Sequence, residues 1–123
     1  MEFGQVHHIE YYVNDLEKSN LFWDWFMQIL SYKKVAEWQG GVSWEHKTGT
    51  YLCFVQVEKE FLKAKNSRQG NGLNHIAFSG GGIEQLDNLQ SELETRKVKI
   101  LKRDEKYLCF EDPNQFAVEV YAQ

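Results

Sequence analysis

Several features that would place this chain in a specialised class are scarce or missing. A single proline among 123 residues argues against disordered and low-complexity sequence. The two cysteines, Cys53 and Cys109, form no CxxC motif, so we expect buried thiols without a disulfide; a thiol nucleophile is the alternative. No apolar run approaches the roughly 18 residues of a membrane-spanning helix, and the start of the sequence shows no signal-peptide core.

The composition that is present fits a globular domain. Apolar residues make up 42% of the chain and aromatic residues 15%. A chain of this length can bury roughly two-thirds of the surface that its unfolded form exposes. The formal net charge is −4 and the basic residues are scattered, which argues against a nucleic-acid interface. We expect a cytoplasmic protein that binds neither nucleic acid nor membranes.

The hydrophobic pattern predicts the order strand, helix, strand, strand, strand twice. In the first half, caps at Asn14 and Asp15 precede a helix with one broad apolar face, and in the second half the stretch "IEQLDNLQSELETR" has helical spacing. The predicted strands are 6–13, 33–37, 41–46, 50–58, 73–79, 97–101, 107–111 and 116–121. The fold class is therefore α+β, with two tandem βαβββ modules in one domain: 1–123 overall, module 1 at about 4–58, a polar linker at about 59–72, and module 2 at about 73–123.

Two repeated stretches give different alignments of the halves. "YLCF" occurs at 51–54 and at 107–110, but these segments fall on the fourth strand of one module and the third strand of the other. We interpret this identity as accidental. The better alignment pairs "HHIEYY" with "NHIAFS", which places His8 opposite His75.

Strand alternation then sorts the polar residues by face. On the first strand the apolar set should pack beneath the helix, with His7 as a packing or edge residue there. This leaves His8 and Glu10 on an open, concave face. The same reasoning turns His75 and Glu119 toward the concave face of the second module. Gln56 is assigned to that face less firmly, because both faces of its strand are apolar.

These residue types could hold a metal ion. Two imidazoles and a carboxylate on one surface can bind a divalent cation and leave positions open for a substrate, and Gln56 would add a neutral oxygen. The alternative is that each histidine is an ordinary core or surface residue. Residues alone leave both interpretations open.

Three stretches resemble the vicinal oxygen chelate superfamily, which includes glyoxalase I, methylmalonyl-CoA epimerase, extradiol dioxygenases, fosfomycin-resistance transferases and bleomycin-binding proteins. They are "HHIEYYVNDLEKSNLFWDWFMQIL", "GNGLNHIAF" and "FEDPNQFAVEVYA". The resemblance implies a curved, mostly antiparallel sheet around a concave metal-binding cleft. It also implies the ligand set His8, Gln56, His75 and Glu119 for a divalent ion such as Ni, Co, Zn, Mn or Fe(II). Gln115 departs from the usual glycine at a turn, which alters the turn and not the ligands.

The resemblance favours a metal-dependent lyase or isomerase of the glyoxalase type. The metal would bind vicinal oxygens of a small α-hydroxycarbonyl-type substrate and stabilise an enediolate, while a carboxylate moves the proton. Glu119 is the candidate base and Glu10 is the alternative, although Glu10 could simply solvate a strand end. The candidate substrate-binding residues, each also open to a packing or solvation role, are Tyr12, Trp44, Tyr121 and Arg68.

Two other functions remain open. The first is a non-catalytic drug-binding protein of the bleomycin-resistance type, in which Trp38 and Trp44 would cradle a flat ligand. The second is an extradiol-type dioxygenase, because His8, His75 and Glu119 would suit ferrous iron. The resemblance further implies a homodimer, with the site within or between subunits.

Overall fold

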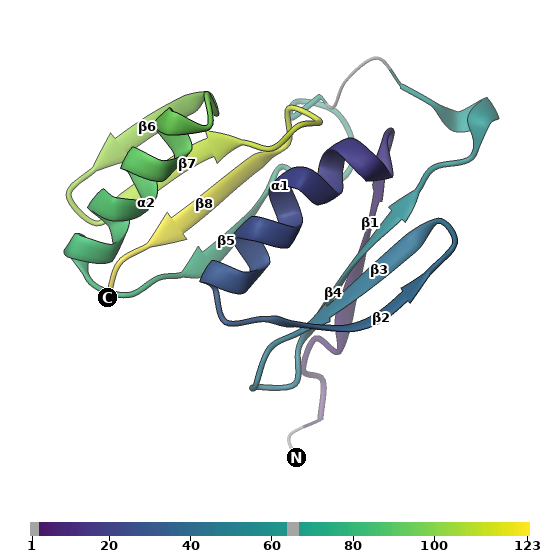
Figure 1. The fold of residues 1–123 in the computed structure, drawn as a ribbon, viewed down its shortest axis with the longest axis horizontal. Helices are drawn as coiled ribbons and strands as arrows, with labels where there is room; N and C mark the ends of the chain where they lie inside the picture. Colours follow the sequence, from purple (N-terminus) through teal and green to yellow (C-terminus); the bar gives the residue numbers. More distant parts are fainter. Residues whose placement is uncertain (1–2, 64–66) are drawn as a thin grey trace. The chain divides into compact units, whose positions relative to one another are not determined.

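The computed structural model describes residues 3–63 and 67–123, in two compact units, Met1–Lys63 and Ala64–Gln123 (Figure 1). Each unit is described by itself. The first unit contains β1 (His8–Val13), α1 (Leu16–Ile29), β2 (Lys33–Trp38), β3 (Gly41–Glu45), β4 (Tyr51–Gln56) and the 3-10 turn η1 (Lys59–Phe61). The second contains β5 (His75–Ser79), α2 (Ile83–Thr95), β6 (Ile100–Asp104), β7 (Tyr107–Glu111) and β8 (Ala117–Tyr121). The predicted βαβββ repeat is confirmed.

The sheet of the first unit has the order β1-β4-β3-β2, with β1 parallel to β4 and the other pairs antiparallel. Helix α1 begins where predicted, because the Asp15 carboxylate accepts a hydrogen bond from the Lys18 backbone N–H. The helix packs on the sheet through aromatic rings: the Trp23 ring lies 4.6 Å from that of Phe54 and 6.2 Å from that of Tyr11. We call the opposite side of the sheet the open face.

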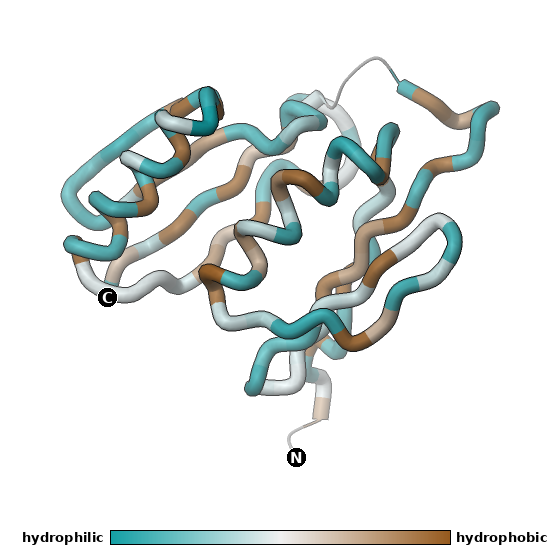
Figure 2. The backbone as a smooth tube through the Cα atoms, in the orientation of Figure 1, coloured by the Kyte–Doolittle hydropathy of each residue, from teal (hydrophilic) through white to brown (hydrophobic). Residues whose placement is uncertain are grey.

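The second unit repeats this arrangement with the order β5-β8-β7-β6, in which β5 and β8 are parallel. Its core is mainly aliphatic; the buried side chains on α2 are Leu86, Leu89 and Leu93, and those of the strands include Leu108, Phe110, Val118 and Val120. Figure 2 shows the alternation of hydrophilic and hydrophobic segments along both helices that allows one side to be buried. "YLCF" lies on β4 and on β7, which occupy different places in the two sheet orders, so that identity is out of register as predicted.

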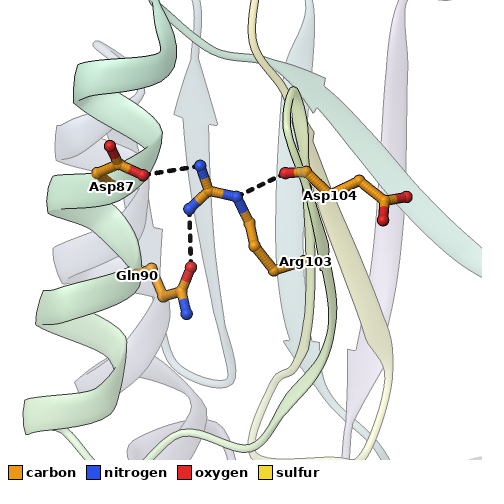
Figure 3. A network of polar contacts seen from close by, with 4 residues as sticks. All are labelled: Asp87, Gln90, Arg103 and Asp104. Atoms are coloured by element: carbon orange, nitrogen blue, oxygen red, sulfur yellow. Dashed lines mark hydrogen bonds and ion pairs between the residues drawn. The ribbon is translucent and has the colours of Figure 1, made fainter.

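Arg103 shows which side of the second sheet faces α2. Its guanidinium donates to Asp87 and to Gln90 of the helix, each at 2.7 Å, and to the backbone oxygen of Asp104 at 2.7 Å (Figure 3). Arg103 is paired with Leu108, and Leu108 with Val120, so these residues share the helix side of the sheet. Tyr107, Cys109 and Glu119 alternate with them and lie on the open face of the second unit.

One predicted strand is displaced. Residues 97–101 were expected to form it, whereas β6 runs from Ile100 to Asp104. The reason is the end of α2, where Lys97 adopts a φ of 61° and the Val98 N–H donates to the Leu93 carbonyl. The chain is still closing the helix at the point where the pattern predicts a strand. Among the described residues, no helix is long and apolar enough to span a bilayer.

Candidate functional site

The register of the second unit brings His75 and Glu119 onto the same face. In the parallel pair of β5 and β8, Ala77 lies opposite Glu119 and His75 opposite Ala117, so all four side chains project from the open face. The His75 Nε2 atom is 3.4 Å from Glu119 Oε1. The Glu119 side chain is only 12% exposed, against 39% for His75. The predicted sharing of a face is therefore correct for this pair.

Asn74 fixes the orientation of the imidazole. Its amide nitrogen donates to the Arg68 carbonyl at 2.8 Å, so the amide oxygen is the atom 2.9 Å from His75 Nδ1. An oxygen at this position accepts from Nδ1–H, which leaves Nε2 of a neutral imidazole with its lone pair toward Glu119. Two acceptors then face each other at 3.4 Å, an arrangement that a shared cation or proton stabilises.

Tyr107 binds the other oxygen of the carboxylate. Its hydroxyl donates to Glu119 Oε2 at 3.0 Å, and its ring lies 4.9 Å from that of Tyr121. Burial, followed by the adjacent Cys109 and the hydrogen bond to Glu119, raises the pKa of Tyr107 far above its ordinary value. The hydroxyl therefore remains a donor at neutral pH.

The neighbouring groups respond to the same carboxylate. Burial and the nearby Glu119 raise the pKa of Tyr121, whose side chain is 47% exposed. Burial, together with the nearby negative charge of Glu119, also raises the pKa of the Cys109 thiol, while the neighbouring Tyr107 hydroxyl and the positive charge of Arg68 lower it. Arg68 is half-buried and close enough to act on Cys109, so its charge lies near this face.

In the first unit, His8, Glu10 and Tyr12 share the open face of β1, as predicted. Their partners on β4 are Tyr51, Cys53 and Val55. All three β1 side chains are exposed, Tyr12 by 57%. Glu10 therefore lies on the same face as His8, two residues along the strand.

The prediction for His7 is wrong. His7 precedes β1 and is exposed instead of packing beneath α1. Its Nδ1 atom lies 3.0 Å from His8 Nδ1, and its ring contacts that of Tyr51 at 5.3 Å. The backbone leaves the strand before the alternation reaches this residue.

The predicted face of Gln56 is also wrong. Gln56 is paired with buried Val13, on the helix side of the sheet. Its amide oxygen accepts from the Leu16 N–H at 2.8 Å, and its amide nitrogen donates to the Asn14 carbonyl at 2.7 Å and the Val57 carbonyl at 3.1 Å. The side chain thus satisfies a free N–H at the start of α1 and ties the helix to β4.

Trp44 does not line the open face. It is 2% exposed and paired with Lys34, whose ammonium lies 5.4 Å from the centre of the indole ring. Trp38, in contrast, is paired with Gly41 and is 46% exposed on the open face. The two tryptophans project from opposite sides of the sheet, so they cannot cradle one flat ligand between them.

Comparison with known proteins identifies the family. No family model matches the chain. The uncharacterized protein YqjT of Bacillus subtilis is 39% identical over 126 residues, spanning 95% of this chain and 98% of YqjT. The crystal structure of a proposed glyoxalase from Bacillus halodurans is 36% identical, with a TM-score of 0.91, covering 98% of this chain and 97% of that one. The chain belongs to the vicinal oxygen chelate superfamily.

A more distant superfamily structure shares the fold. The fosfomycin resistance protein FosX from Listeria monocytogenes, in complex with Mn(II) and sulfate, superposes with a TM-score of 0.69 at 20% identity. The match covers 99% of this chain and 91% of FosX. At this identity the likeness extends to the fold alone.

The pair in the second unit fits a divalent metal. Ligands that each lie about 2.1 Å from one metal ion are about 3.0 Å apart at a right angle and about 3.4 Å apart at a tetrahedral angle. The separation of His75 Nε2 and Glu119 Oε1, 3.4 Å, falls within this span. Within residues 3–63 and 67–123, no group of three or more His, Cys, Asp or Glu side chains is gathered tightly enough to hold a metal. Of the four predicted ligands, the structure brings together His75 and Glu119.

Sequence reasoning missed Asn74 and Tyr107. Asn74 lies directly before β5, and its amide orients His75. Its position directly before the histidine was the available signal. Tyr107 lies in the "YLCF" stretch that was set aside as accidental, and only the pairing of β7 with β8 brings it to Glu119.

Proposed function

We propose that this chain is a metal-dependent lyase or isomerase of the glyoxalase type. Its substrate would be a small molecule with two neighbouring oxygens, such as an α-hydroxycarbonyl compound. The observation that carries the proposal is the contact between His75 Nε2 and Glu119 Oε1, with the second atom of each group already engaged by Asn74 and Tyr107. Metal ligands are commonly oriented by such outer contacts.

The proposed ligands are His75 and Glu119, with His8 as a further ligand supported by the sequence repeat. Imidazole and carboxylate donors suit Ni, Co, Zn, Mn and Fe(II). Gln56 is left out of this set, because its amide oxygen already accepts the Leu16 N–H. The Mn(II) complex of FosX supports a divalent ion in a superfamily member.

The protein groups would divide the remaining work. A bound metal would supply Lewis-acid stabilisation of negative charge on the substrate oxygens. Glu119 would serve by turns as metal ligand and as base through Oε1, because Oε2 accepts the Tyr107 hydroxyl. Glu10 is the alternative base, and it is exposed on the face that also carries His8. Tyr12, Tyr121 and the half-buried Arg68 would contact the substrate.

Metal binding by untagged protein tests the proposal first. Wild-type protein should bind Mn(II) or Co(II) in calorimetry and melt at a higher temperature in their presence, because a ligand of the native state stabilises it. His75→Ala and Glu119→Gln should each remove this stabilisation. His8→Ala should weaken it, whereas His7→Ala should leave it unchanged.

Two results would sink the proposal. One is wild-type protein that binds none of Ni, Co, Zn, Mn and Fe(II). The other is a metal-loaded protein that fails to exchange the α-proton of α-hydroxycarbonyl compounds for deuterium. Proton NMR in D2O measures this exchange. Loss of binding in His7→Ala alone would show that the ligand assignment on β1 is wrong.

A further inference from the structure

We propose that Tyr107 is a positioning residue that makes Glu119 bind metal through a single oxygen. This inference rests on the proposed function, since it concerns the same carboxylate. The Tyr107 hydroxyl holds Oε2 at 3.0 Å, while Oε1 is the oxygen that lies 3.4 Å from His75 Nε2. The two oxygens therefore have different partners before any metal arrives.

The surroundings hold Tyr107 in place. It lies directly opposite Tyr121 in the antiparallel pair of β7 and β8, and the two rings are in contact. On its other side, the Lys102 ammonium lies 5.9 Å from the centre of the Tyr107 ring. The half-buried ring thus has neighbours on both adjacent strands, so little conformational freedom remains to be lost when the hydroxyl binds the carboxylate.

The first unit lacks this hydroxyl at the equivalent place. His8 and His75 occupy matching positions in the two sheets. Two residues after His8 lies the cross-strand pair Glu10–Cys53, and two residues after His75 lies the pair Ala77–Glu119. Cys53 therefore occupies the position that corresponds to Glu119. The residue that corresponds to Tyr107 is Gly41, where an added Cβ would lie 2.3 Å from the Trp38 ring. The tyrosine is therefore present near Glu119, and a glycine stands at the corresponding position near Cys53.

The chemistry of the contact explains its use. A carboxylate can bind a cation through one oxygen or both, and a donor fixed on one oxygen favours the first mode. A metal would then keep one more position open for substrate oxygens.

The test compares metal binding by wild-type protein and by Tyr107→Phe, which retains the ring against Tyr121. Outer contacts of this kind change metal affinity by about 10- to 100-fold, so the Kd for Mn(II) should rise by that factor. The visible absorption of the Co(II) complex should also change, which loss of packing alone would not cause. Tyr32→Phe is the matched control, because that ring lies in the first unit against His46, and its Kd should match wild type.

A second measurement uses the wild-type protein alone. With 13C-labelled glutamate, the carboxylate stretches that change on adding metal to wild type, and that do not change in Glu119→Gln, should show the splitting of a one-oxygen ligand. Unchanged Kd and Co(II) absorption in Tyr107→Phe, or a two-oxygen pattern in wild type, would overturn the inference and leave the proposed function intact. Wild-type protein that binds no metal would overturn both.

Discussion

The two units place their polar residues differently on the same framework. On the open face of the first unit, a carboxylate follows the histidine on the same strand, at Glu10, and its cross-strand partner is the thiol of Cys53. In the second unit the strand residue is Ala77, and the carboxylate stands on the partner strand at Glu119. The carboxylate stands on a different strand in the two units, and in the second unit it lies 3.4 Å from the histidine.

The residues around these positions differ accordingly. Cys53 is buried and its thiol donates to Ser43 at 3.3 Å, a contact that completes a packed surface. Glu119 contacts His75 and Tyr107 through different oxygens. Gln56, three residues beyond Cys53, has turned to the helix and serves α1. A repeated fold therefore allows one copy to bring a histidine and a carboxylate together, while the other uses Cys53 and Gln56 in structural contacts.

A substitution in the aromatic core of the first unit should have the largest effect on stability. In the first unit Trp23 is fully buried among aromatic rings, whereas the second unit has a mainly leucine and valine core with Phe110 and Phe116. Trp23→Ala should lower the free energy of unfolding by about 3–5 kcal/mol, because it removes a large buried ring and leaves a cavity. Urea denaturation measures this change. Leu21→Ala, at an exposed site on the same helix, is the control and should change it by less than about 0.5 kcal/mol.

A substitution of Gln56 should lower stability and leave metal binding unchanged. Gln56→Ala leaves the Leu16 N–H at the start of α1 without its partner, which should cost about 1–2 kcal/mol of unfolding free energy. Metal affinity should be unchanged. Calorimetry with Mn(II) and urea denaturation on the same variant provide both values, and a variant that is stable but unable to bind metal would reverse the assigned roles.

Tyrosine ionisation should produce the smallest effect, visible only at alkaline pH. The pKa of Tyr107 is raised in the folded protein, so below the unfolded value of about 10 both states keep the proton and stability does not depend on it. Above that pH the unfolded chain loses the proton first, and stability should fall. Denaturation curves measured from about pH 9 to about pH 11, roughly one unit on each side of that pKa, give the free energy of unfolding at each pH. This free energy should fall less steeply with pH in Tyr107→Phe than in wild type, and equal slopes would contradict this account.

Local patterns predicted much of the molecule. Alternation along single strands placed His8 with Glu10, and it placed His75 on the face that carries Glu119, because side-chain direction depends only on neighbouring residues. The cap at Asp15 was equally local. The strand predicted at 97–101 was misplaced. Lys97 adopts a left-handed conformation that ends the helix there, and hydropathy does not reveal such a conformation.

The errors at the site come from relations between strands. On β4 both faces are apolar, so the pattern gave Gln56 no clear side, and the pairing with Val13 decides it. Trp44 was a candidate for ligand binding because it is a large aromatic side chain, but its pairing with Leu52 puts it on the buried helix side. The contact of Tyr107 with Glu119 depends on the register of β7 against β8, which no spacing within either segment encodes.

The most direct test of the account is anomalous diffraction from a crystal of the wild-type protein grown with Mn(II). The account predicts an anomalous peak bonded to both His75 Nε2 and Glu119 Oε1, with Tyr107 still donating to Glu119 Oε2 and Gln56 still bound to the Leu16 N–H. A peak bonded to the Gln56 amide oxygen, or metal sites that avoid the His75–Glu119 pair, would contradict it.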